Sequence, residues 1–157
     1  MENIDFDHAY YIKLGEKGKW EQSSIKEGKM RIGWTNVSLD DIHRERWDRI
    51  EDAIRDKVSN PGSATHDFNS LKTIHGSSHD DVWITFTDSK LWWCRLQNGP
   101  ILEDEISKYR LLDGGWHDRS IQGKSLLVNT LPGAVAQLQA YQATSCTVRP
   151  LDTLRRL

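Results

Sequence analysis

Tryptophan is the residue type in this chain with the clearest potential for binding chemistry. The chain has 157 residues and seven of them are Trp, three of which lie between residues 83 and 93. Trp116 follows Gly114-Gly115 and precedes Arg119, so an aromatic ring and a cation stand together where a loop is expected. An indole stacks on a nucleobase with about 1–3 kcal/mol, and neighbouring cations bind phosphates. This pattern indicates a pocket for a flat ligand, and core packing of all seven rings is the simpler alternative.

Two carboxylates and a lysine form a second candidate site. Asp81 precedes Asp88 and Lys90, and some nucleases bind Mg²⁺ through two carboxylates while a lysine orients the attacking water. Asp, Ser and Lys in succession are also typical of a hairpin turn, so we favour the turn interpretation for residues 88–90. His75 and His79 have i, i+4 spacing but no intervening glutamate for a zinc protease. We expect no metal and no cofactor.

Cysteine usage and hydropathy limit the setting of the chain. Cys94 and Cys146 are too few for a disulfide framework or a zinc knuckle, and Cys94 fits an inert buried thiol. No apolar run approaches the ~18 residues of a membrane-spanning helix, and the acidic N-terminus does not fit a secretory signal. We therefore expect a cytoplasmic protein.

Charge is distributed unevenly along the chain. The formal net charge is −2, which argues against coating nucleic acid by bulk electrostatics. Residues 108–157 nevertheless carry seven basic and three acidic side chains, whereas residues 1–107 carry 14 and 20. This asymmetry suggests phosphate contacts from Arg110, Arg119 and Lys124, with chance clustering as the alternative.

Short strands and two helices are expected to position these residues. Alternating apolar residues predict strands over 8–14, 30–34, 109–112 and 145–148, and a hairpin formed by 81–87 and 91–96. Ser38 suits a helix N-cap, and a second helix is expected from about Ala64 to Ile74. Trp92 and Trp93 should point to opposite faces of the sheet. The predicted class is α+β, with a curved, mostly antiparallel sheet and a helical insertion at about 38–78.

The length fits one domain over residues 1–157. The last residues, 150–157, resemble the start of a helix that is cut short, with Pro150 and Asp152 at its entry. We expect a domain excised from a longer protein.

Several segments together resemble one family. Residues 10–15 (YYIKLG), 18–21 (GKWE) and 30–34 (MRIGW) resemble the opening of PUA-like modules. Residues 82–86, 91–95 and 115–118 follow in the same order as in that group. The group includes the EVE, YTH and SRA-type readers, several of which are specificity domains of modification-dependent (type IV) bacterial restriction systems.

This resemblance implies a curved β-barrel whose pocket encloses a flipped, modified base within an aromatic cage. The expected function is recognition of DNA that carries a methylated or hydroxymethylated cytosine or a methylated adenine, in antiphage defence, beside a fused nuclease or NTPase domain. Trp34 and Trp116 are the expected cage walls, with Trp20 and Trp93 as further candidates. Asp118 and Asn129 are the expected contacts to the base edge. The helical insertion would cover the pocket or replace DNA contacts made by a shorter loop.

Three other functions stay open at this point. The first is a metal-dependent nuclease centred on Asp81, Asp88 and Lys90. The second is an RNA-binding module of the same fold, and the third is a protein-interaction domain that uses the inserted helices. We favour the non-enzymatic reader of modified DNA.

Overall fold

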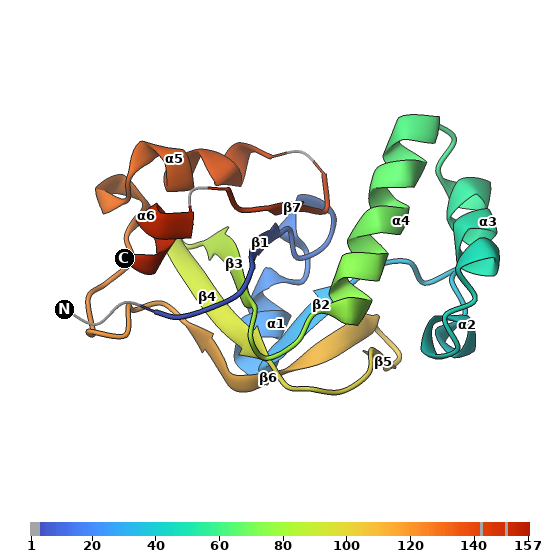
Figure 1. Cartoon of the computed structure of the whole chain (residues 1–157), viewed down its shortest axis with the longest axis horizontal. Coiled ribbons are helices and arrows are strands. Elements are labelled where there is room, and N and C mark those ends of the chain that lie inside the picture. The colour runs from blue at the N-terminus through green and yellow to red at the C-terminus, as the bar shows by residue number, and fades with distance from the viewer. Residues whose placement is uncertain (1–3, 142, 150) are drawn as a thin grey trace.

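A curled, seven-stranded sheet forms the centre of the molecule in the computed structural model, which describes residues 4–141, 143–149 and 151–157 (Figure 1). The strand order is β2-β6-β4-β3-β1-β7, and β5 pairs with β6 outside this path. The strands are β1 (Ala9–Ile12), β2 (Lys29–Ile32), β3 (Val82–Thr87), β4 (Lys90–Leu96), β5 (Leu102–Glu103), β6 (Lys108–His117) and β7 (Ser145–Thr147). All pairs are antiparallel except β1 with β3. The predicted α+β class with a curved, mostly antiparallel sheet is confirmed, as a half-barrel with β2 and β7 at its edges.

Helices cover both faces of this sheet. They are η1 (Glu16–Gly18), α1 (Glu21–Glu27), α2 (Leu39–His43), α3 (Trp47–Lys57), α4 (Pro61–Gly76), η2 (Val128–Thr130), α5 (Gly133–Ala136), η3 (Gln137–Ala140) and α6 (Leu151–Arg155). The predicted insertion corresponds to α2, α3 and α4, which stand together on one side of the sheet (Figure 1). Pro150, which we expected at the entry to α6, lies outside the described residues. Within the described part of the chain, every helix is too short or too polar to cross a bilayer.

The inserted helices differ from the prediction at their boundaries. Ser38 caps α2 as expected, since its side chain accepts a hydrogen bond from the Asp41 backbone N–H. The single helix predicted after Ser38 is divided into α2 and α3, because Glu45 between them adopts a positive φ of 55°. Helix α4 begins at Pro61, three residues earlier than expected, because Asn60 caps it and proline suits the first helical position.

The predicted hairpin is confirmed, and its turn explains the residues at 88 and 89. Thr87 pairs with Lys90, which leaves Asp88 and Ser89 as a two-residue loop. Both have positive φ, 54° and 60°, the conformation of turns whose twist matches that of the flanking strands. The position of Asp88 is therefore explained by its role in the hairpin turn.

The segment expected to be a loop at residues 113–115 is part of β6. Gly114 and Gly115 have φ of 78° and 74°, and the pairing of β6 with β4 shifts register between Trp93 and Arg95. Irregularities of this kind bend a strand without ending it. The first half of β6 pairs with β2 and the second half with β4, so this bend contributes to the curl of the sheet.

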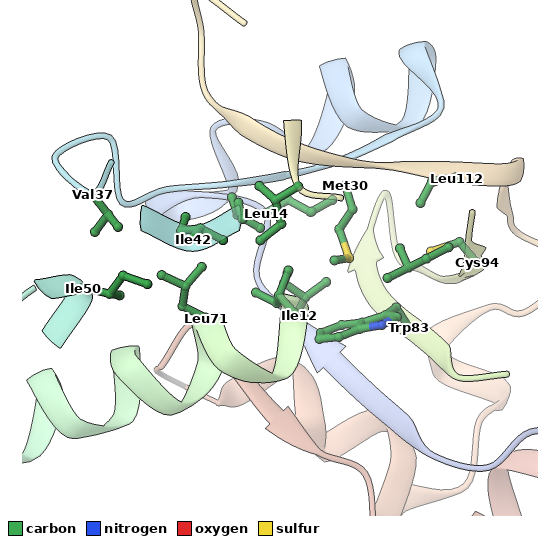
Figure 2. Packing of buried hydrophobic residues seen from close by; sticks show 14 of the residues in the cluster. Ile12, Leu14, Met30, Val37, Ile42, Ile50, Leu71, Trp83, Cys94 and Leu112 are labelled. Atoms are coloured by element: carbon green, nitrogen blue, oxygen red, sulfur yellow. The ribbon is translucent and has the colours of Figure 1, made fainter. Parts of the chain in front are cut away.

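Two apolar clusters lie against the sheet, one on each face. The first contains Ile12, Met30 and Trp83 and extends to the inserted helices through residues such as Ile50 and Leu71 (Figure 2). The second lies beneath α5 and α6 and includes Tyr11, Ile84 and Val135. Trp92 packs against the first cluster and Trp93 against the second, so the prediction that they point to opposite faces is confirmed.

An ionic network around the buried Arg31 joins β2 to the loop between β5 and β6. The Arg31 side chain is 1% exposed and donates two hydrogen bonds to the Asp104 carboxylate, at 3.0 and 2.9 Å. It also donates to Glu27 at 2.8 Å. Asp104 accepts the backbone N–H groups of Ile106 and Ser107 as well. The bonds from Arg31, with those backbone donors, hold the pKa of Asp104 well below its usual value.

We predict that this network makes the fold sensitive to acid. Because the pKa of Asp104 is lowered on folding, its contribution is complete above the ordinary Asp pKa of about 4 and is lost as the pH falls below it. Asp104→Asn should lower the free energy of unfolding at pH 7 by about 1–3 kcal/mol, since Arg31 keeps its bond to Glu27, and should flatten its decline between about pH 5 and 2. Urea unfolding at a series of pH values measures both effects. Asp152→Asn, which changes an exposed pair with Arg155, is the control and should cost under about 1 kcal/mol. An unchanged acid profile in Asp104→Asn would contradict the prediction.

Candidate ligand-binding cleft between Trp20 and Trp34

A cleft opens where the start of α1, the end of β2 and the helix α4 meet. Its volume is about 410 Å³, within the range of about 300–1,000 Å³ found for small-molecule sites. The residues that line it are Lys13, Gly15, Glu16, Lys19, Trp20, Ile32, Gly33, Trp34, Asp67 and Thr144. We call it the tryptophan cleft, because two of the four predicted cage residues, Trp20 and Trp34, lie in it together.

Trp34 has a backbone conformation that is costly for its residue type. Its φ is 59°, in the left-handed region that costs a non-glycine residue about 1–2 kcal/mol. The Lys108 ammonium donates a hydrogen bond to the Trp34 carbonyl oxygen at 2.8 Å, and the Val37 N–H donates to the same oxygen at 3.0 Å. The Lys108 side chain is fully buried and pairs with Glu103 at 2.8 Å. Contacts from β5 and β6 therefore fix the backbone that carries the Trp34 ring, as is common where strain serves a site.

Trp20 is positioned by a glycine. Its backbone N–H donates to the Leu14 carbonyl at 3.0 Å, which folds the chain back over Gly15. A Cβ atom on Gly15 would lie 2.8 Å from Cε3 of the Trp20 ring, and the φ of Gly15 is 84°. Only glycine allows the indole to lie this close to the backbone. The Lys19 ammonium lies 4.5 Å from the centroid of the same ring.

The two indoles of the cleft differ from most other tryptophans in their surroundings. Trp47, Trp83 and Trp93 each pack against another aromatic ring. In the part of the chain that the structure describes, neither Trp20 nor Trp34 does so, and both are only partly buried. Ring surface is thus left at the cleft for a planar ligand.

Charged groups surround this aromatic surface. Asp67 reaches the cleft from α4; partial burial raises the pKa of its carboxyl, while hydrogen bonding to Trp34 and the nearby His66 act in the opposite direction. Lys13 and Lys19 contribute two cations and Glu16 one further carboxylate. The cleft can therefore stack a flat group, bond its polar edge through Asp67 and attract an anionic substituent.

Trp116 and Arg110 are not where we expected them. Trp116 lies in β6 rather than in a loop, is 8% exposed, and donates from its indole to the Lys29 carbonyl at 2.9 Å. It packs in the first apolar cluster and does not line the cleft. Arg110 is 1% exposed. Its guanidinium donates to three backbone carbonyls, those of Ile74, Ser77 and Gln97, so the prediction that it binds phosphate is wrong.

Five other predicted residues, Trp93, Asp118, Arg119, Lys124 and Asn129, lie elsewhere. Trp93 donates to the Arg119 carbonyl at 2.7 Å and its ring lies 4.5 Å from that of His117. The neighbouring Asp118 pairs with Lys90 at 2.9 Å, and this bond lowers the pKa of the Asp118 carboxyl. Lys124 is exposed in the same loop region, and Asn129 is exposed in η2. None of these residues lines the tryptophan cleft.

The proposed nuclease residues do not converge. Asp81 precedes β3 and Asp88 follows it, so a six-residue strand of about 20 Å separates them. Asp81 accepts hydrogen bonds from the Ser77 hydroxyl at 2.8 Å and from the Ser78 backbone N–H at 3.2 Å. Among the described residues no three metal-ligating side chains come together. A metal site built from Asp81, Asp88 and Lys90 is therefore excluded by their positions.

Sequence reasoning missed three residues that shape the cleft. The role of Gly15 could have been predicted, because it stands in a Gly-rich turn shortly before Trp20. The roles of Asp67 and Lys108 could not have been predicted from the sequence, since they depend on contacts between distant segments.

Compared with known proteins, the chain matches no family model, no curated protein and no solved structure. Functional inference therefore rests on the chain's own residues.

We predict that Gly15→Ala disrupts the cleft. The added Cβ meets the Trp20 ring and the positive φ is strained, so the free energy of unfolding should fall by about 1–3 kcal/mol. Tryptophan fluorescence should shift as Trp20 is displaced. Gly33→Ala is the matched control, because a Cβ at that cleft glycine meets nothing within 4 Å. Chemical denaturation and emission spectra check both variants, and equal effects of the two would refute this account of Trp20.

Proposed function

We propose that this chain is a recognition domain that binds DNA containing a modified base, and that the base, flipped out of the helix, occupies the tryptophan cleft. The observation that carries the proposal is the pair Trp20 and Trp34, which line one cleft and are both only partly buried. The PUA-like architecture is part of the same proposal, supported by the curled sheet and the order of the quoted segments along the chain.

The aromatic surface favours a planar ligand. Each indole can contribute about 1–3 kcal/mol by stacking on a base, which helps to offset the few kcal/mol that flipping costs. A methyl group on the base adds up to about 0.8 kcal/mol when it is buried against such a wall. Preference for a modified base then follows from apolar contact alone.

The charged groups suit a nucleotide, which needs cations for its phosphates and an acceptor for its base edge. Glu16 and Asp67 would also suit a cage for a quaternary ammonium, but Lys13 and Lys19 balance these carboxylates, so the lining has no net negative charge to hold a simple cation. The same lysines attract the phosphates on either side of a flipped base. Asp67 is suited to the base edge, since its carboxylate accepts from an exocyclic amino group and its protonated form can donate.

We predict that Trp34→Ala abolishes discrimination between modified and unmodified DNA. Loss of one stacking wall should weaken binding of the modified oligonucleotide by about 5- to 150-fold, which corresponds to 1–3 kcal/mol. Fluorescence anisotropy with labelled oligonucleotides that differ in a single modified base, at fixed salt, measures the effect. Trp20→Ala should act in the same direction.

Trp93→Ala is the control, because it removes a half-buried indole that packs on the opposite face of the sheet. It should leave discrimination unchanged once its folding has been verified by thermal melting. Equal discrimination by Trp34→Ala and the original chain would overturn the cleft assignment. Tighter binding of the matching RNA than of the DNA would replace DNA as the target.

A further inference from the structure

The tryptophan cleft does not end at Asp67. A second hollow of about 510 Å³ shares Asp67 and Thr144 with it, and is otherwise lined by Asn60, Gly62, Ser63, His66 and Ala143. A third, of about 500 Å³, shares His66 with the second. We call this third one the Tyr141 pocket; it is also lined by Asn69 and Thr73 from α4, by Tyr141 and by Arg149. Shared residues thus connect three hollows in one series.

This series follows α4 and the strand β7 beside it. His66 bonds to the Ser145 carbonyl at 2.9 Å, and the Ser70 and Ser145 hydroxyls are 2.8 Å apart. Six residues of helix from Asp67 to Thr73 rise about 9 Å, and three residues of strand beyond Thr144 rise about 10 Å. The far end of the Tyr141 pocket therefore lies about 10 Å along α4 and β7 from Asp67 and Thr144 of the cleft, a span of up to about three stacked nucleotides at about 3.4 Å each.

The Tyr141 pocket has the groups that hold a nucleotide. The Tyr141 side chain is 37% exposed, and its ring lies 6.1 Å from that of His66. Arg149 is exposed at the pocket, and among the described residues that line it there is no Asp or Glu. Asn69 and Thr73 add hydrogen-bonding side chains from α4. An aromatic platform beside an uncompensated cation is what an unpaired nucleotide requires.

We propose that the Tyr141 pocket binds a nucleotide close to the base held in the tryptophan cleft, so that the ligand is a locally unpaired DNA strand that runs along α4 past His66. This inference rests on the proposed function and deepens it. It makes affinity depend on the strand around the modified base, whereas discrimination depends on the tryptophan cleft. In this proposal Arg149 binds the phosphate of that nucleotide and the Tyr141 ring stacks on its base.

The test compares two ligands, a mononucleotide with the modified base and a single-stranded DNA heptamer with the same base at its centre. The heptamer should bind at least tenfold more tightly to the original chain. Tyr141→Ala should weaken heptamer binding by about fivefold or more, as one lost stack does, and leave both mononucleotide binding and the preference for the modified base unchanged. Tyr141→Phe keeps the ring and should restore the affinity. Arg149→Gln should reduce the salt dependence of heptamer binding by about one phosphate contact, whereas Arg44→Gln, which changes an exposed pair with Asp40, should not.

Two failures can be told apart. If mononucleotide discrimination depends on Trp34 but the heptamer binds no more tightly, or Tyr141→Ala binds it normally, only the strand path is overturned. If neither ligand is discriminated by the original chain, the proposed function falls and the strand path with it. Equal losses in Tyr141→Ala and Tyr141→Phe would also contradict a stacking role for the ring.

Discussion

The buried ammonium of Lys108 is the constraint on which the cleft depends. An amine of this kind is stable in the interior only when it is paired and hydrogen-bonded, and here Glu103 and the Trp34 carbonyl meet that need. The hydrogen bond from Lys108 to the Trp34 carbonyl also holds Trp34 in the left-handed backbone conformation, which large side chains otherwise avoid. Stability and site geometry are therefore coupled through one nitrogen atom.

That coupling extends into the neighbouring strands. Lys108 begins β6, directly after the loop that Arg31 and Asp104 fix to β2. Trp34 follows the end of β2, where the register pairs Ile32 with Lys108. The pairing of β2 with β6 thus sets the distance between the ammonium and the carbonyl it must reach. One wall of the cleft is an extension of the sheet, whereas Trp20 is placed by a local turn around Gly15.

Local signals in the sequence predicted the parts of the fold that local physics controls. The cap at Ser38, the turn at Asp88-Ser89 and the opposite orientations of Trp92 and Trp93 each depend on a few adjacent residues. Trp20 and Trp34 were selected by the family resemblance instead, and the placement of Trp34 depends on the distant Lys108. The prediction that Arg110 binds phosphate was wrong because its hydrogen-bond partners, the carbonyls of α4 and of the segment after β4, are distant in the sequence. A basic residue that will satisfy buried carbonyls cannot be told from a surface cation by composition. The prediction that Trp116 lies in a loop was wrong because two glycines, which are typical of a loop, also permit a bend within a strand.

The position of β1 determines how this fold must be assembled. This early strand lies between β3 and β7, parallel to the first and antiparallel to the second. Its two neighbours come from the middle and the far end of the described chain, so loop-closure entropy opposes both pairings. Folds built on such distant pairings form slowly compared with helical bundles. Because the contacts of the hairpin β3–β4 are local, we expect this hairpin to form before β1 pairs with either of its neighbours.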